Sequence, residues 1–510
     1  MRVRNRRFCT FGLVLILLIA LTPRFVGAQA GKGSPKTAML LLPNSSPLVS
    51  FRILFNVGSV LDPRGKEGVA ALTASMLSDG GSRSMSYEEI VQDMFPMATG
   101  FNSQVDKEMT VFVGATHTDN LEKYYRIISA MLLDPGWRED DFKRIQENAI
   151  NNLTVNLRGN NDEELGKEAL YDFIYSGHPY GHNNLGTVEA LKKLTLDDVK
   201  TFYRENYTQA NLVIGLAGGY TKDFADKIKA DFAAKLPVGA PAKVALPEPE
   251  KINGREMRII QKDTPATAIS FGFPLPVKRS DPDWPALLVV QSYLGQHRSS
   301  NSHLYQVMRE VRGLNYGDYA YIEYFPRGMF QFHPDPNLGR RQQIFQVWIR
   351  PVEPKNGLFA LRIGLYELDR LVRGGMSKED FEGTRQFLTK FANVLTKAQD
   401  DQLGYALDSR YYGIPTFSDY VREQLKKLTL DDVNRAIKKY LQAVNVKIVV
   451  VTKDADAFRA AAVEGKPSPI SYTSPPAKDI LEEDKGIESY KLNFSPDRIV
   501  VTPVDRVFEK

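Results

Sequence analysis

The residues best suited to chemistry in this 510-residue sequence are Arg309 and Tyr316, seven positions apart in MREVRGLNYGDYAYIEYF. Arginine offers a charged planar fork and tyrosine offers a hydroxyl donor, so the pair is physically suited to stabilising negative charge. A structural interpretation stays open, because Gly313 would end a helix and Tyr316 would begin a strand whose tyrosines simply pack.

Candidate metal ligands are few and badly spaced. His178 and His182 lie four residues apart, but Pro179 and Gly181 interrupt the helix that would place both on one face, so a structural turn is the better explanation. The chain has six histidines and one cysteine, Cys9. No grouping of these residues in the sequence indicates a metal site.

The sequence contains an internal repeat, which concerns the elements expected to position these residues. The segment LKKLTLDDV occurs at residues 191–199 and again, unchanged, at residues 425–433. In each copy a threonine, Thr195 or Thr429, stands three residues before an aspartate, which predicts a capped helix start. Each helix leads into an apolar strand, NLVIGLAG or VKIVVVT. The repeat therefore predicts two homologous lobes.

Other segments fit the same plan. SFRILFNVGSV alternates Phe51, Ile53, Phe55 and Val57, as a half-buried strand does, and TAISFGFPLP plays this part in the second half. We expect an α+β fold of two homologous lobes, each with helices packed on a mostly antiparallel sheet. The expected parts are a signal peptide (1–30), an N-terminal lobe (31–237), a linker (238–256), a C-terminal lobe (257–465) and a tail (466–510) that straps onto a lobe or onto a partner.

Several motifs, in order, are similar to those of the M16 (pitrilysin/insulinase-type) peptidases. They are DPRGKEGVAALTASML at 62–77, HPYGHNNLGTVEALKKLTLDDVKTFYRENY in the first lobe and REVRGLNYG in the second. The similarity spans roughly residues 45 to 460. It implies that the helix within residues 68–82 corresponds to the helix that carries the zinc motif of that family.

The resemblance also implies that the zinc site has been lost. In the family, two histidines at i and i+4 and a later glutamate bind zinc, and an intervening glutamate is the general base. The two histidine positions fall on Ala71 and Ser75, and the later glutamate falls on Asn152. The general base falls on Ala74. A structural zinc site contributes ~10–16 kcal/mol, which one serine and one asparagine cannot approach. We expect no metal and no general base, only a helix whose small residues pack closely.

The same resemblance gives the Arg309/Tyr316 pair a role. In M16 peptidases such a pair comes from the second lobe, faces the zinc site, holds the substrate backbone and stabilises the oxyanion. Some members work as two short chains, one with the zinc motif and the other with the pair. By this resemblance Arg309 and Tyr316 would bind substrate in a heterodimer with a zinc-bearing sister chain. A homodimer stays open.

Three functions follow as expectations. The first is a catalytically inactive subunit that binds extended or unfolded peptides, has no cofactor of its own and acts only within a zinc metalloendopeptidase complex. The second is a stand-alone exported peptide-binding or scaffold protein, in which the aromatic segment from Tyr316 to Phe332 lines an apolar groove. The third, an independently active peptidase, is disfavoured because no ligand set survives.

The N-terminus predicts export. Residues 1–30 combine a basic start, an apolar run from Phe11 to Leu21 that is short for a membrane span, and an Ala-Gln-Ala cleavage site. An uncleaved anchor is the alternative. This segment holds five arginines and Cys9, so its removal leaves no net formal charge and no thiol. A neutral chain gives no reason to expect nucleic acid. We expect the periplasm, with secretion as the alternative.

Overall fold

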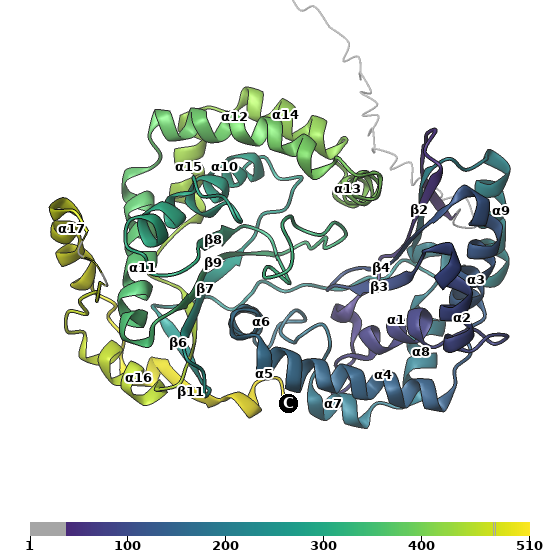
Figure 1. Cartoon of the computed structure of the whole chain (residues 1–510), viewed down its shortest axis with the longest axis horizontal. Helices are drawn as coiled ribbons and strands as arrows, with labels where there is room; N and C mark the ends of the chain where they lie inside the picture. Colours follow the sequence, from purple (N-terminus) through teal and green to yellow (C-terminus); the bar gives the residue numbers. More distant parts are fainter. Residues whose placement is uncertain (1–36, 473, 475) are drawn as a thin grey trace, which may run out of the picture.

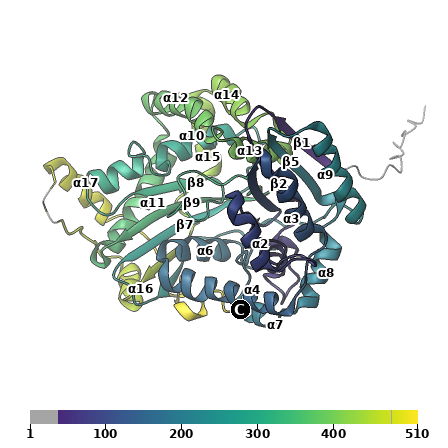
Figure 2. The same ribbon diagram turned by 45° about the vertical axis from the view of Figure 1, so that its right-hand side comes forward.

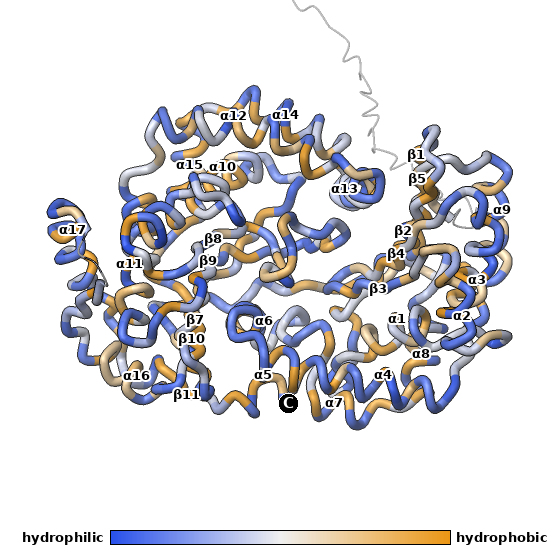
Figure 3. Tube along the Cα trace, viewed as in Figure 1, coloured by the Kyte–Doolittle hydropathy of each residue, from blue (hydrophilic) through white to orange (hydrophobic). Residues whose placement is uncertain are grey.

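The computed structural model describes residues 37–472, 474 and 476–510, so the expected signal peptide and Cys9 lie outside the described residues. Two lobes lie side by side, each a sheet covered by helices (Figure 1). Hydrophobic segments concentrate on the strands and on the inward faces of the helices (Figure 3). The expected α+β class is confirmed.

The N-lobe contains five strands and most of the first nine helices of the described chain. Its elements are β1 (Ala38–Pro43), β2 (Leu48–Phe55), α1 (Val69–Asp79), α2 (Tyr87–Met94), β3 (Phe101–Val105), β4 (Thr110–His117), α3 (Leu121–Leu133), α4 (Glu139–Asn151), a π-helical segment (Asn152–Leu157), α5 (Arg158–Asn160), α6 (Asp162–Ile174), α7 (Val188–Lys193), α8 (Leu196–Asn206), β5 (Leu212–Gly218) and α9 (Lys222–Lys235).

The C-lobe follows an extended linker and repeats this order. Its elements are β6 (Glu256–Gln261), β7 (Thr267–Leu275), α10 (Trp284–Gly295), a π-helical segment (Tyr305–Glu310), β8 (Asp318–Tyr321), β9 (Gln343–Val352), α11 (Gly357–Gly374), α12 (Lys378–Leu395), α13 (Gln399–Tyr412), α14 (Phe417–Lys427), α15 (Leu430–Tyr440), β10 (Lys447–Thr452), α16 (Ala455–Glu464), α17 (Lys478–Glu488) and β11 (Ile499–Pro503).

The two sheets have matching topology. The N-lobe order is β1-β5-β2-β4-β3, and the C-lobe order is β6-β10-β7-β9-β8 with β11 added beside β6. In both, the pairs beside β2 and β7 are antiparallel, and β1–β5 and β6–β10 are parallel. The predicted helix starts are confirmed, because Thr195 and Thr429 each cap their helix by accepting a hydrogen bond from the backbone three residues on, at 3.2 Å.

One helix of each lobe packs on the sheet of the other lobe. Helix α6 packs on β7, β9 and β10 of the C-lobe (Figure 2), and α13 packs on β1, β2 and β5 of the N-lobe. The expectation of a half-buried β2 is therefore wrong. Arg52 and Leu54 are buried as fully as Phe51 and Ile53, because α13 covers the face that the alternation left to solvent.

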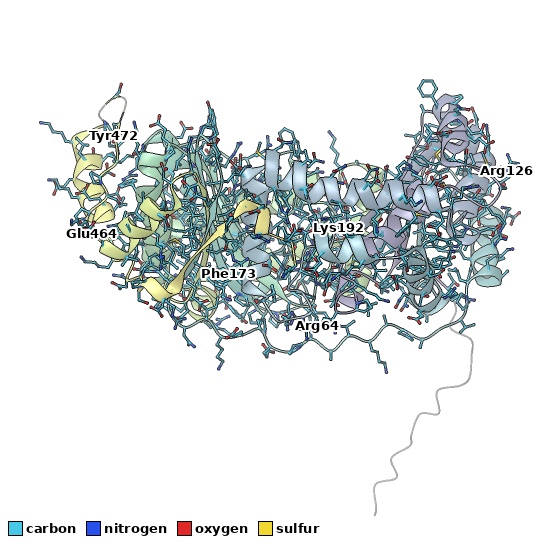
Figure 4. The ribbon with its side chains drawn as sticks, turned by 90° about the horizontal axis from the view of Figure 1, so that it is seen from below. Arg64, Arg126, Phe173, Lys192, Glu464 and Tyr472 are labelled. Carbon is cyan, nitrogen blue, oxygen red and sulfur yellow. The ribbon has the colours of Figure 1, made fainter. Side chains whose placement is uncertain are left out.

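The C-terminal tail straps the two lobes together. Helix α17 packs on α11, and β11 pairs in parallel with β6. Beyond β11 the chain crosses to the N-lobe (Figure 4), where Val507 O accepts a hydrogen bond from Arg158 Nε at 2.6 Å and Phe508 O accepts one from Val188 N at 3.0 Å. Of the two alternatives left open by the sequence, the tail attaches within its own chain.

One connection breaks the match between the lobes. Residues 106–109 join β3 to β4, whereas residues 322–342, the β8–β9 loop, join the corresponding strands of the C-lobe. The longer connection reaches the N-lobe, where Lys167 Nζ on α6 donates a hydrogen bond to Phe325 O at 2.5 Å.

Candidate functional site

Helix α1 is capped and closely packed. The Asp62 carboxylate accepts hydrogen bonds from the backbone N–H groups of Gly68 (2.7 Å) and Ala70 (2.9 Å) at its start. The helix packs against β3, α4 and α8. Ala71 and Ala74 are buried, with exposed fractions of 6% and 0%. Their small side chains let the neighbouring elements approach α1 closely.

The residues at the four zinc-site positions do not fit zinc. Ser75 is half-buried on α1, whereas Asn152 is exposed where the π-helical segment begins. The Oδ1 atom of Asn152 accepts a hydrogen bond from Asn156 Nδ2 at 2.7 Å. Neither alanine supplies a donor atom. Within residues 37–472, 474 and 476–510, no group of three or more His, Cys, Asp or Glu side chains is arranged to hold a metal ion.

Asn152 lines a cavity of about 800 Å³ between the lobes, here called the inter-lobe cavity. Its walls include β3, which is the edge strand of the N-lobe sheet, and part of the β8–β9 loop. The polar lining combines six charged side chains, those of Arg52, Glu164, Glu168, Arg327, Asp335 and Asp400, with seven amide groups, which can donate and accept hydrogen bonds. These amides belong to Asn102, Gln104, Asn152, Asn156, Asn161, Asn183 and Asn184.

A buried arginine joins the lobes behind this cavity. Arg340, at the end of the β8–β9 loop, donates two hydrogen bonds to Asp106 in the β3–β4 turn, with Nε 2.7 Å from Oδ2. Both side chains are at most 1% exposed. The guanidinium carbon also lies 3.7 Å from the centre of the Tyr324 ring and 4.5 Å from that of Tyr171. The arrangement is a desolvated ion pair clamped between aromatic rings.

Two further buried ionisable groups adjoin this pair. Glu168 on α6 accepts hydrogen bonds from Tyr324 Oη at 2.6 Å and from Asn183 Nδ2 at 2.9 Å. Burial, reinforced by the nearby Glu164 carboxylate, raises the pKa of Glu168 to about 7. Burial lowers the pKa of Lys107 to about 7, with the Arg340 charge acting in the same direction. The junction between the lobes thus contains groups that titrate near neutral pH.

The turn that carries Arg309 and Tyr316 is held by its own hydrogen bonds. Gly313 adopts a left-handed φ of 64° and donates to Arg309 O at 2.8 Å, which ends the π-helical segment. A second contact spans Tyr316, because Asn315 Nδ2 donates to Asp318 Oδ1 at 2.7 Å. These contacts fix the backbone on both sides of the tyrosine.

The structure brings the predicted pair together but keeps it apart from Asn152. The guanidinium carbon of Arg309 lies 5.8 Å from the centre of the Tyr316 ring and 4.7 Å from that of Tyr305. Tyr316 is 75% exposed and the Arg309 side chain is 36% exposed. Neither residue lines the inter-lobe cavity. Both donors are therefore accessible to solvent and to a second molecule.

Two models, both of one protein family, match this sequence. Insulinase (peptidase family M16) matches residues 39–188, and the peptidase M16 inactive domain matches residues 193–388. The chain belongs to the M16 peptidase family. The structure and sequence together describe an inactive M16-like homologue, because none of the four zinc-site positions carries the residue of the motif.

The curated M16 relatives are distant. The non-peptidase homolog YmxG of Helicobacter pylori is 21% identical over 415 residues, which cover 80% of this chain and 89% of that protein. An uncharacterized zinc protease of Mycobacterium leprae is 22% identical over 361 residues, 66% of this chain and 79% of that protein. The crystal structure of a peptidase M16 inactive domain from Pseudomonas fluorescens has a TM-score of 0.71 and 22% identity, covering 82% of this chain and 96% of that one. This last likeness shows the M16 fold.

Sequence reasoning missed the residues that join the lobes, above all Asp106, Glu168 and Arg340. The available signal was the unequal length of the two hairpin connections, which becomes visible once the repeat is aligned. In the aromatic segment, Tyr319 and Tyr321 are buried core residues, whereas Phe332 is 66% exposed. No helix of the described residues is long and apolar enough to cross a bilayer.

Proposed function

We propose that this chain is a non-catalytic M16 subunit that pairs with a zinc-bearing M16 chain and supplies Arg309 and Tyr316 to that chain's site. The proposal rests on one observation, the neighbouring and solvent-exposed side chains of Arg309 and Tyr316, which do not line the inter-lobe cavity. Exposed donors outside that cavity are available to a site on another molecule. Their role there is to hold the peptide backbone and stabilise the developing oxyanion.

Peptide binding has separate support. Strand β3 is an edge of the N-lobe sheet and forms part of the inter-lobe cavity, and an exposed edge can accept an extended peptide as an added strand. The amide-rich wall of the cavity offers donors and acceptors to such a chain. We extend the proposal to export into the periplasm, which N-terminal sequencing of the native protein tests by locating the cleavage site.

The experiment is reconstitution with the zinc-bearing M16 chain of the same genome. The mixture should cleave an unfolded peptide faster than either chain alone, and Arg309→Ala should lower kcat/KM by roughly 10²–10³, the usual effect of losing one preorganised donor. Arg422→Ala is the matched control, because this side chain on α14 is 44% exposed. Full activity of the zinc-bearing chain alone, or no effect of Arg309→Ala, would falsify the proposal.

The alternative is a stand-alone exported peptide-binding protein, and the inter-lobe cavity of this chain favours it. A native pull-down separates the two proposals. Recovery of a zinc-bearing M16 chain in equal amount supports the subunit, whereas recovery of peptides without any M16 chain supports the stand-alone protein.

A further inference from the structure

A second, smaller pocket lies beside the inter-lobe cavity. Its volume is about 80 Å³, and its walls come from α10, α12, α13, β8 and the β8–β9 loop. Helix α10 lies between α12 and β8 (Figure 1). Tyr324, Asp335 and Leu338 line both spaces, so the two spaces adjoin at these residues. We call this space the side pocket.

The side pocket presents apolar surface that the fold leaves incompletely covered. Leu288 on α10, Phe391 and Leu395 on α12, and Leu338 in the β8–β9 loop are all partly exposed, and Phe332 is 66% exposed. Each would be more stable in full contact with other apolar groups. They converge on one small space, unlike single apolar residues scattered over a surface.

The charged groups in the lining of the side pocket already have partners of opposite charge. Arg279 binds Glu323 through three hydrogen bonds, at 3.0, 3.2 and 2.9 Å, and Asp335 pairs with Arg327, which lies outside the lining. A ligand in the side pocket therefore meets rings and aliphatic groups, and no unpaired charge among these residues draws in an ion.

The β8–β9 loop is fixed where it borders the side pocket. His297 bridges Tyr321 Oη and Gln331 O, at 2.8 Å each. Arg298 Nη2 donates to Met329 O at 2.6 Å, and its guanidinium carbon lies 4.6 Å from the centre of the Phe332 ring. The exposed ring of Phe332 is thus held in place before any ligand arrives, which lowers the entropic cost of binding.

The size of the side pocket selects the kind of ligand. Small-molecule sites usually measure about 300–1,000 Å³, and a cavity of about 150 Å³ holds benzene. A space of about 80 Å³ fits one aliphatic side chain of the size of valine or leucine. Beside it lies a cavity ten times larger, lined by amides and a sheet edge that suit a peptide backbone.

We infer that the side pocket is a specificity site that takes one aliphatic side chain of an extended peptide whose backbone lies in the inter-lobe cavity. The inference shares with the proposed function only the premise that this chain binds peptides, and it requires no partner chain. It assigns a substrate class, namely unfolded segments with a medium-sized aliphatic residue.

The test uses the full-length isolated chain and fluorescence anisotropy. The probes are labelled peptides of one neutral polar sequence that differ at a single position, which carries Ser, Leu or Trp. The Leu peptide should bind roughly 10- to 100-fold more tightly than the Ser peptide, the usual discrimination of an apolar pocket. Phe391→Ala removes a wall and should shift the preference from Leu to Trp, whereas Leu395→Trp fills the space and should abolish the Leu preference.

The control is Phe95→Ala, which removes an aromatic ring that is 84% exposed and does not line the side pocket. It should leave the ranking of the three peptides unchanged. Equal affinities of the wild-type chain for the Leu and Ser peptides, or a ranking that neither pocket variant alters, overturns the inference. So does a Phe391→Ala variant that weakens only binding of the zinc-bearing chain, since the surface would then dock a protein. If the mixture with the zinc-bearing chain fails to cleave peptides, the ranking of peptide affinities still tests this inference.

Discussion

The buried Asp106–Arg340 pair should be worth several kilocalories per mole to the folded chain. Asp106→Asn keeps the shape of the side chain but removes the carboxylate that is hydrogen-bonded to the Arg340 guanidinium, at a site where both groups are at most 1% exposed. Breaking such a pair by changing one partner costs about 3–5 kcal/mol. The rings of Tyr171 and Tyr324 remain as cation–π partners, so the lower half of that range is the expectation.

Urea unfolding followed by tryptophan fluorescence measures this loss, because Trp137 lies in the N-lobe and Trp284 and Trp348 lie in the C-lobe. The control is Glu189→Gln, which breaks a solvent-exposed pair with Lys193 and should leave the free energy of unfolding nearly unchanged. The double change Asp106→Leu with Arg340→Met should recover part of the loss, because apolar residues can replace a buried pair. A loss below about 1 kcal/mol for Asp106→Asn would refute the reasoning.

Three further predictions address other parts of the chain. Phe508→Ala removes a ring that is 6% exposed and should lower the free energy of unfolding by about 3–5 kcal/mol. Trypsin should then cut at Arg506 faster. An unchanged rate of cleavage would contradict the role of the C-terminal tail in holding the lobes together. Burial raises the pKa of Asp318 to about 8, so stability should fall as pH rises from about 4 to 8, and Asp318→Asn should flatten this trend in thermal melts; parallel curves contradict it. Ala74→Glu buries a carboxylate without a cation and should lower the Tm equally with and without zinc; recovery on adding zinc would show that the site still binds metal.

Local features of the fold could be read from the sequence because their causes are local. A threonine and an aspartate three residues apart mark the starts of α8 and α15, and the motif order places Ala71 and Asn152 without any knowledge of the lobes. The turn that joins Arg309 to Tyr316 is equally local, since a glycine at 313 supplies the left-handed residue.

Contacts between the lobes could not be read in this way. The alternation of β2 indicates one solvated face, but a helix from the other half of the chain covers that face. Asp106 and Arg340 are 234 residues apart, and nothing near either residue in the sequence indicates a buried partner. The side pocket depends on the same long-range packing, since its walls come from helices and a loop that meet only in the folded C-lobe.

The anchoring of the β8–β9 loop links stability to the inferred peptide specificity. Arg340 holds the end of this loop to the N-lobe, and Leu338, two residues earlier, lines the side pocket. Weakening the contact of Arg340 with Asp106 should therefore reduce the difference in affinity between the Leu and Ser peptides. The Arg309/Tyr316 pair stands on a different turn, which Gly313 and Asn315 hold without help from the loop. A folded Asp106→Asn variant should accordingly lose peptide discrimination while it still supports cleavage in the reconstituted complex, because the two functions depend on separately fixed parts of one lobe.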